Sequence, residues 1–133
     1  MFMRKIFFVL SLFLFLVSSS FAVVTYNTKA RTPRHSGYYE TMLQTDMYEV
    51  QFITDSWFHT KNFCMLRCAN LCLENGYKSF NIVRFSDETD RVQVHYFCVC
   101  VSIECFRDDS GKYKAEEIKT NLYKLFNIKE EIN

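Results

Sequence analysis

Cysteine is the residue type in this chain whose number and spacing point most clearly to chemistry. Three cysteines recur at every fourth position in the stretch CMLRCANLCLENGYKSF, and three more follow in CVCVSIEC. Cysteine sulfurs can bind zinc, act as redox dithiols or join as structural disulfides. The six candidates are Cys64, Cys68, Cys72, Cys98, Cys100 and Cys105.

The start of the chain favours disulfides among these possibilities. The stretch MFMRKIFFVLSLFLFLVSSSFA has basic residues, then an apolar run, then small residues, which is typical of a secretory signal peptide. The apolar run is shorter than the roughly 20 residues that a membrane span needs. We therefore expect residues 1–22 to be cleaved and the rest to be secreted and extracellular, without a membrane partner. An even number of cysteines in such a protein predicts disulfides, because the export route is oxidising.

Other chemistries lack the patterns that they usually require. The spacing C-x-x-C, common to structural zinc sites and dithiol redox centres, is absent. His59 or His95 could join the cysteines around a metal or form an acid–base pair, but no catalytic motif accompanies them. The net charge of +1 gives no long-range attraction for nucleic acid. We predict no metal, no cofactor and no enzyme activity.

The N-terminal part of the expected mature chain has no sustained periodicity. Residues 23–45 contain the only proline, Pro33, and are interpreted as a flexible N-terminal arm. Within them, Arg31 and Arg34 fit a minimal Arg-x-x-Arg processing site, with a solvated loop as the alternative. Residues 46–133 are expected to form a single domain.

Regular patterns follow from residue 46. MYEVQFIT (47–54) alternates as a half-buried strand does. Residues 55–76 predict an amphipathic helix, with Asp55, Ser56 or Thr60 as N-cap and Asn75-Gly76 as the stop. Residues 77–85 and 91–103 predict two more strands around a polar hairpin tip, SDETDR.

The last predicted strand is apolar on both faces, so both faces should be covered. We expect the segment 112–133 to cover the second face as a helix, or to add a final strand. The predicted fold class is a small disulfide-stapled α+β domain. One helix is cross-linked to an antiparallel sheet in the order β–α–β–β, and a C-terminal helix or strand follows.

The cysteine spacings suggest how helix and sheet are joined. Residues four apart on a helix form a ridge that rises about 6 Å per step, and alternate strand residues lie about 6.6 Å apart on one face. Cys98 and Cys100 thus match two successive positions of the ridge. Two ordered sets fit a helix parallel to this strand: Cys64–Cys98 with Cys68–Cys100 and Cys72–Cys105, or Cys68–Cys98 with Cys72–Cys100 and Cys64–Cys105.

The run CANLCLEN, followed by KSFN and later CVC, resembles a PAN/apple module. In that family a helix carries C-x₃-C, the next strand carries a Ser-Phe-type pair, and a later strand returns a half-cystine to the helix. The resemblance implies a helix pair at Cys68 and Cys72, a core aromatic at Phe80, and Cys98 or Cys100 as the returning partner. It implies a secreted, non-enzymatic module that binds an extracellular protein or glycan.

A second resemblance leads to a different class of function. C-x₃-C on a helix with C-x-C on a final strand is similar to the cysteine-stabilised αβ scaffold of defensins and toxins, which implies a secreted effector. For the binding module, the expected contact surface is the hairpin tip, at Asp87, Glu88 and Asp90.

Overall fold

The computed structural model describes residues 24–129, so the expected signal peptide at residues 1–22 lies outside the described range. Within that range the fold is α+β, as predicted, with two helices and a five-stranded antiparallel sheet. No helix of the described range is long and apolar enough to cross a membrane. In chain order the elements are β1 (Gly37–Gln44), β2 (Met47–Thr54), α2 (Trp57–Glu74), β3 (Ser79–Asp87), a 3₁₀ turn (Thr89–Arg91), β4 (Phe97–Phe106), β5 (Tyr113–Lys114) and α3 (Ala115–Leu125).

The sheet has the strand order β1-β2-β4-β3-β5, and every neighbouring pair is antiparallel. Its first strand corrects the expectation of a flexible arm at residues 23–45, because Gly37–Gln44 pairs with β2 along its whole length. The strand is anchored by its side chains as well as its backbone. The ring centres of Tyr38 and Phe52 lie 6.3 Å apart, and the carboxylate of Glu40 accepts a hydrogen bond from Arg67 of α2. The β–α–β–β order therefore gains a strand at its start.

The helix α2 begins and ends where its sequence signals predict. Ser56 is the N-cap, and its side chain accepts a hydrogen bond from the backbone N–H of His59 at 3.3 Å. Asn75 is the C-cap, and Gly76 takes the left-handed conformation, with φ of +80°, that ends many helices. Thr60, another predicted N-cap, is instead buried, with its hydroxyl 2.8 Å from that of Thr54.

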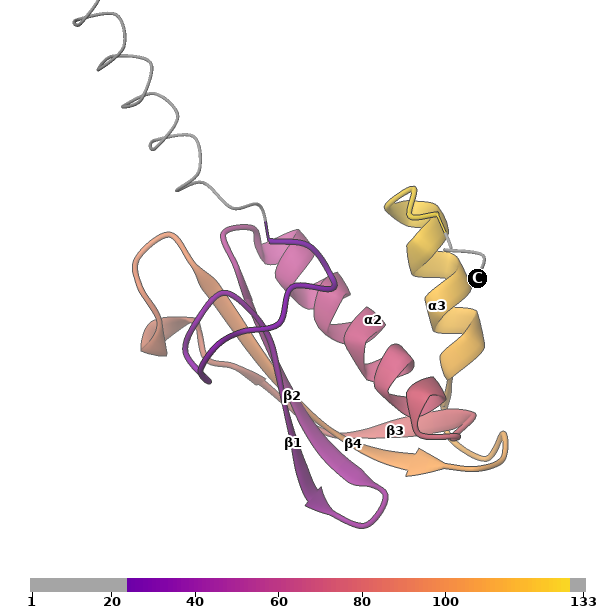
Figure 1. The fold of residues 1–133 in the computed structure, drawn as a ribbon. Helices are drawn as coiled ribbons and strands as arrows, with labels where there is room; N and C mark the ends of the chain where they lie inside the picture. Colours follow the sequence, from indigo (N-terminus) through magenta and orange to yellow (C-terminus); the bar gives the residue numbers. More distant parts are fainter. Residues whose placement is uncertain (1–23, 130–133) are drawn as a thin grey trace, which may run out of the picture.

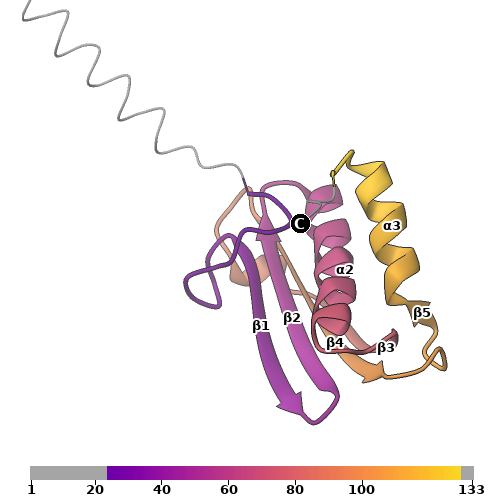
Figure 2. The same ribbon diagram turned by 45° about the vertical axis from the view of Figure 1, so that its right-hand side comes forward.

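The C-terminal segment forms both of the elements that its pattern allows, a two-residue strand β5 beside β3 and the helix α3. However, α3 packs beside α2, so the expectation that it covers the second face of the last strand is wrong (Figure 1). Figure 2 shows both helices on one side of the sheet. The rings of Phe63 and Phe126 lie 4.9 Å apart, because α2 still has aromatic side chains to bury after it has covered the sheet.

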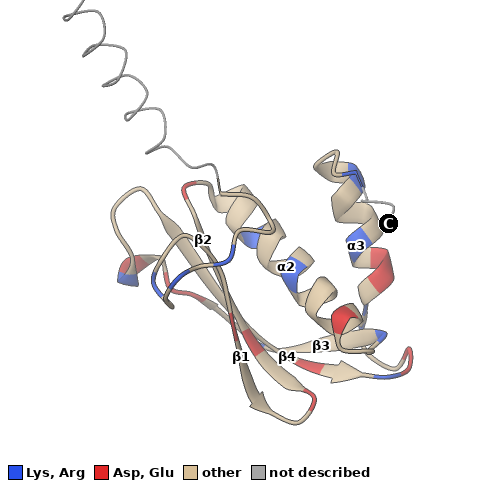
Figure 3. Cartoon of the chain, viewed as in Figure 1, with Lys and Arg blue, Asp and Glu red and all other residues tan. Residues whose placement is uncertain are grey.

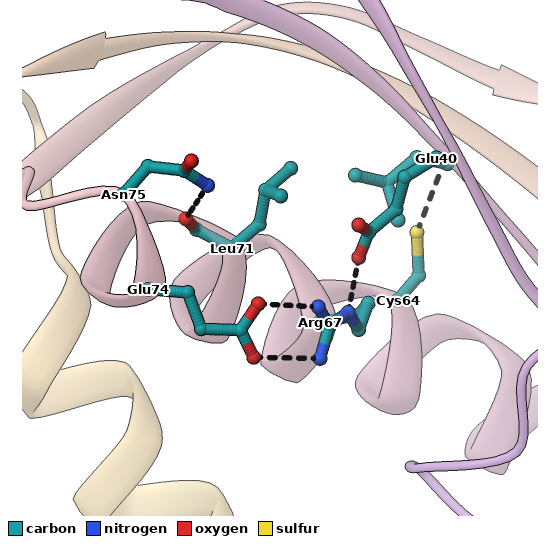
Figure 4. A network of polar contacts seen from close by, with 7 residues as sticks. Glu40, Cys64, Arg67, Leu71, Glu74 and Asn75 are labelled. Carbon is teal, nitrogen blue, oxygen red and sulfur yellow. Dashed lines mark hydrogen bonds and ion pairs between the residues drawn. The ribbon is translucent and has the colours of Figure 1, made fainter.

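Charged residues of both signs are spread over the sheet and the helices (Figure 3), and Arg67 is the one charged residue in the range 24–129 that is buried, at 5% exposure. Its guanidinium bonds to Glu40 of β1 and forms two parallel bonds, 3.2 and 2.8 Å long, with Glu74 of α2 (Figure 4). It also lies 4.3 Å from the centre of the Tyr38 ring. Burial alone lowers the pKa of Arg67, but the bonds to both carboxylates outweigh it and raise that pKa. The network ties β1 to α2.

Candidate functional site on the open face of the sheet

The register of β4 divides the six cysteines between the two faces of the sheet. The odd-numbered residues from Val99 to Cys105 lie in the core beneath α2. Because strand side chains alternate, Cys98 and Cys100 lie on the opposite face, which neither helix covers. We call Cys98 and Cys100 the outer pair. The helix-side group is Cys64, Cys68, Cys72 and Cys105.

In the helix-side group, the sulfurs of Cys72 and Cys105 are in contact. Their Sγ atoms lie 3.1 Å apart, whereas none of the six cysteines is disulfide-bonded in the structure. The contact raises the pKa of Cys72 and lowers that of Cys105. Cys64 donates to the carbonyl oxygen of Val50 at 3.6 Å. The neighbouring Cys64, followed by burial, raises the pKa of Cys68.

This arrangement overturns the bridges from Cys98 and Cys100 to the helix in both expected sets, whereas the contact between Cys72 and Cys105 matches the third pair of the first set. The helix does run parallel to β4, since the rings of Trp57 and Phe97 meet near the start of both elements and Cys72 meets Cys105 near their ends. The spacing of alternate residues on β4 does match the spacing of the cysteines on α2. However, the residues of β4 that lie beneath those cysteines have odd numbers. A shift of one residue moves a strand side chain to the other face, so neither Cys98 nor Cys100 can reach α2. Cys105 takes the place of the returning partner.

The outer pair lies beside the connection between β3 and β4. Cys98 is 2% exposed and its backbone N–H donates to the Thr89 hydroxyl at 3.2 Å. Cys100 is partly exposed, and its Sγ lies 3.6 Å from a carboxylate oxygen of Glu88. Because the two cysteines are neighbours on this face, Cys100 lowers the pKa of Cys98, and Cys98 raises that of Cys100. The pair thus resembles a dithiol in which Cys98 is the readier thiolate.

The three carboxylates expected at the hairpin tip have different environments. Asp87 ends β3 and accepts two hydrogen bonds from Thr89, from its backbone N–H at 3.0 Å and its hydroxyl at 2.6 Å. Glu88 is half-buried and faces Cys100, as well as Arg91 at 3.9 Å. Asp90 is exposed in the 3₁₀ turn, and it forms no hydrogen bond or ion pair with any other residue in the range 24–129. Two of the three residues therefore hold the loop together.

A cavity of about 190 Å³ lies next to this loop, on the open face. The Gln51 amide of β2 donates a hydrogen bond to the carbonyl oxygen of Pro33, and this bond holds the loop before β1 against the sheet beside the cavity. Neither His59 nor His95 belongs to the lining. The lining residues are Arg34, His35 and Ser36 from the loop before β1, Ile53 from β2, and Val92, Gln93 and Tyr96 from the loop before β4.

Sequence reasoning did not identify this cavity, because its walls come from segments about 60 residues apart that only the sheet register brings together. The one usable signal was the cluster of Arg31, Arg34 and His35 in an otherwise featureless segment. Within the described residues no group of three or more His, Cys, Asp or Glu side chains is placed to hold a metal ion.

Comparison with known proteins does not extend these observations. No protein-family model, curated protein or solved structure matches the chain. The geometry of the cysteines and of the open face is therefore the basis for the functional proposal.

Proposed function

We propose that this chain is a secreted, non-enzymatic binding module of the PAN/apple type that recognises an extracellular protein or glycan. Three observations support the proposal. Cys72 of the helix lies 3.1 Å from a cysteine of a later strand. Phe80, the expected core aromatic, is fully buried. The Ser79 hydroxyl, the other half of the Ser-Phe pair, bonds to the carbonyl oxygen of Asp108 at 2.6 Å and fastens the loop before β5.

The disulfide state forms part of the proposal. In an oxidising compartment the contact between Cys72 and Cys105 becomes a bridge between helix and sheet, because the sulfurs need to approach by only about 1 Å to reach bonding distance. Cys64 and Cys68 remain buried thiols, since Cβ atoms four residues apart on a helix are about 5–6 Å apart and a disulfide needs about 3.5–4.5 Å.

The cavity on the open face is the observation that carries the binding function. Its lining residues include Arg34, His35 and Gln93, which carry a guanidinium, an imidazole and an amide, together with the aromatic Tyr96. A planar cation and an aromatic ring in one lining suit a carboxylate-bearing ligand, such as an acidic sugar or an acidic side chain. The volume is below the roughly 300–1,000 Å³ of sites for drug-sized ligands, so one sugar unit or one side chain would occupy it.

The competing toxin-like or defensin-like effector receives no comparable support. That scaffold would use the C-x-C of the last strand to hold the helix, whereas Cys98 and Cys100 face away from α2. A toxicity or growth-inhibition assay separates the two functions, because the binding module alone should be inactive in it.

Binding is tested with the secreted protein on a glycan array that includes acidic sugars, and by capture of extracellular proteins. Arg34→Ala and Tyr96→Ala should each weaken a positive interaction by about tenfold or more, the equivalent of one good polar or aromatic contact. Arg84→Ala is the matched control, because Arg84 is exposed on β3 and does not line the cavity. An interaction that survives both cavity variants but is lost with Arg84→Ala would contradict the assignment of the site.

A further inference from the structure

The outer pair has an arrangement that neither the core nor the proposed binding site requires. We propose that Cys98 and Cys100 form an exchange-active disulfide on the open face of the sheet, which reacts with the thiols of a partner protein. The inference goes beyond the binding function. It rests only on the proposed oxidising compartment and not on the identity of any ligand of the cavity.

Within the chain, each cysteine of the outer pair has the other as its sole possible partner. The remaining four cysteines lie on the helix side of β4. On the open face, Cys100 is flanked by Gln51 of β2 and Ser86 of β3, and Cys98 pairs with Ile53. No other sulfur of the six cysteines lies in these rows, so oxidation of Cys98 or Cys100 within the molecule joins them to each other.

Such a bond is expected to be easy to reduce, because the backbone of β4 opposes it. Two strand residues on the same face are about 6.6 Å apart at Cα, near the upper limit of about 6.8 Å for disulfides. The Cβ atoms of two bonded cysteines are normally only about 3.5–4.5 Å apart. Closing the bond must pucker β4, which is held on both sides by β2 and β3. Strained and accessible disulfides are typically the labile and reactive ones.

The exposure of the two residues sets the direction of exchange. A thiolate of the partner attacks the partly exposed Cys100 sulfur, forming a mixed disulfide, and the electrons of the broken bond leave on the Cys98 sulfur. The second thiolate of the partner then attacks the partner sulfur that is bonded to Cys100 in the mixed disulfide, and Cys100 is released as a thiolate. The partner dithiol is oxidised by two electrons to a disulfide and the outer pair is reduced by two.

The proton balance also fits the surroundings of the pair. The partner gives up two protons, of which one goes to the Cys100 thiolate and the other to solvent. Glu88, 3.6 Å from the Cys100 sulfur, can pass the first proton. In the product, the neighbouring Cys100 lowers the pKa of Cys98, which stabilises the reduced form and favours oxidation of the partner.

The direct test is a redox titration of the wild-type secreted protein in mixtures of reduced and oxidised glutathione, with thiols alkylated before and after full reduction. Proteolysis after Arg and Glu places the outer pair in fragment 92–104 and Cys105 in fragment 105–107. The quantity compared is the squared concentration of reduced glutathione divided by the concentration of oxidised glutathione. We expect the value at which the outer pair is half-reduced to be at least about tenfold lower than the value for the Cys72–Cys105 bridge. The same midpoint for both, or an outer cysteine bonded elsewhere in the chain, would overturn the proposal.

Single variants test the order of attack. In Cys98→Ser, the remaining Cys100 should form a mixed disulfide with oxidised glutathione, and in Cys100→Ser the buried Cys98 should react at least about tenfold more slowly. Circular dichroism verifies that both variants are folded. Equal rates, or faster reaction of Cys98, would reject the assigned roles, and the wild-type titration decides the existence of the exchange-active pair even where a variant does not fold.

Discussion

The Sγ atoms of Cys72 and Cys105 lie 3.1 Å apart, and this contact joins the last turn of α2 to the end of β4. The two residues are 33 positions apart in the chain. A bond between them would close a loop that contains all of β3 and most of β4, so it would restrict the unfolded chain strongly. The first prediction follows from this contact.

Replacing Cys72 or Cys105 by alanine should lower the free energy of unfolding of the oxidised protein by about 4 kcal/mol, the loop-closure value for a loop of this length. The double variant should cost little more than either single one, because both remove the same bond. Urea unfolding measures these values. Cys64→Ala is the control on the same ridge and should cost less than about 2 kcal/mol; a cost as large as that of Cys72→Ala would argue against the proposed bridge.

Glu40→Gln should destabilise the fold more than Glu74→Gln. Both carboxylates bond to the buried Arg67, but the side chain of Glu40 is 21% exposed and that of Glu74 is 55% exposed. Weakening the more buried pair should cost about 3 kcal/mol, and weakening the more exposed pair less than about 1 kcal/mol. In an Arg67→Met background the difference should largely vanish. Denaturant unfolding of the variants checks this, and equal costs in the native background would contradict the network.

Gly111→Ala should destabilise the protein by about 1–3 kcal/mol through steric conflict. A Cβ atom at this position would lie 2.7 Å from the backbone nitrogen of Phe80 and 2.8 Å from the hydroxyl of Ser79. Both neighbours belong to β3 and cannot move without disturbing the pairing with β4. Thermal unfolding tests the effect, with Lys112→Ala, an exposed neighbour, as control. A normal melting temperature for Gly111→Ala would show that the loop packs differently.

Asp87→Ala should cost about 1 kcal/mol of stability, while Asp90→Ala should be close to neutral. The carboxylate of Asp87 accepts two bonds from Thr89, whose hydroxyl in turn accepts from the backbone N–H of Cys98. Asp90 is exposed and has no such role. Urea midpoints compare the two variants, and amide exchange at Cys98 should speed up in Asp87→Ala alone. A larger loss of stability from Asp90→Ala would reverse the roles assigned to these residues.

The elements that could be predicted from the sequence are those with a local signal. The strand 47–54 and the helix between Ser56 and Asn75 were predicted correctly, because alternation and caps are encoded within a few residues. The strand β1 was missed, since GYYETMLQ shows little alternation and its burial depends on β2 and Arg67. Such pairing is determined by distant residues.

The face of β4 could not be deduced from its pattern. The segment is apolar at both odd and even positions, so periodicity does not indicate which face of β4 turns toward α2. The cysteine spacing favoured the face of Cys98 and Cys100, which is the wrong face. The structure instead places valine and isoleucine beneath α2 and leaves the C-x-C outside. The cavity depends on the same register, so it too could not be predicted.

Non-reducing peptide mapping of the oxidised protein is the sharpest test of the proposed disulfide arrangement. Cleavage after Lys, Arg and Glu separates the cysteines into fragments 62–67, 68–74, 92–104 and 105–107. We expect this arrangement to give fragment 68–74 joined to fragment 105–107, fragment 92–104 with an internal bond, and fragment 62–67 with a free thiol. Fragment 92–104 joined to 62–67 or 68–74 would contradict it, because a cysteine of the open face would then be bonded to the helix.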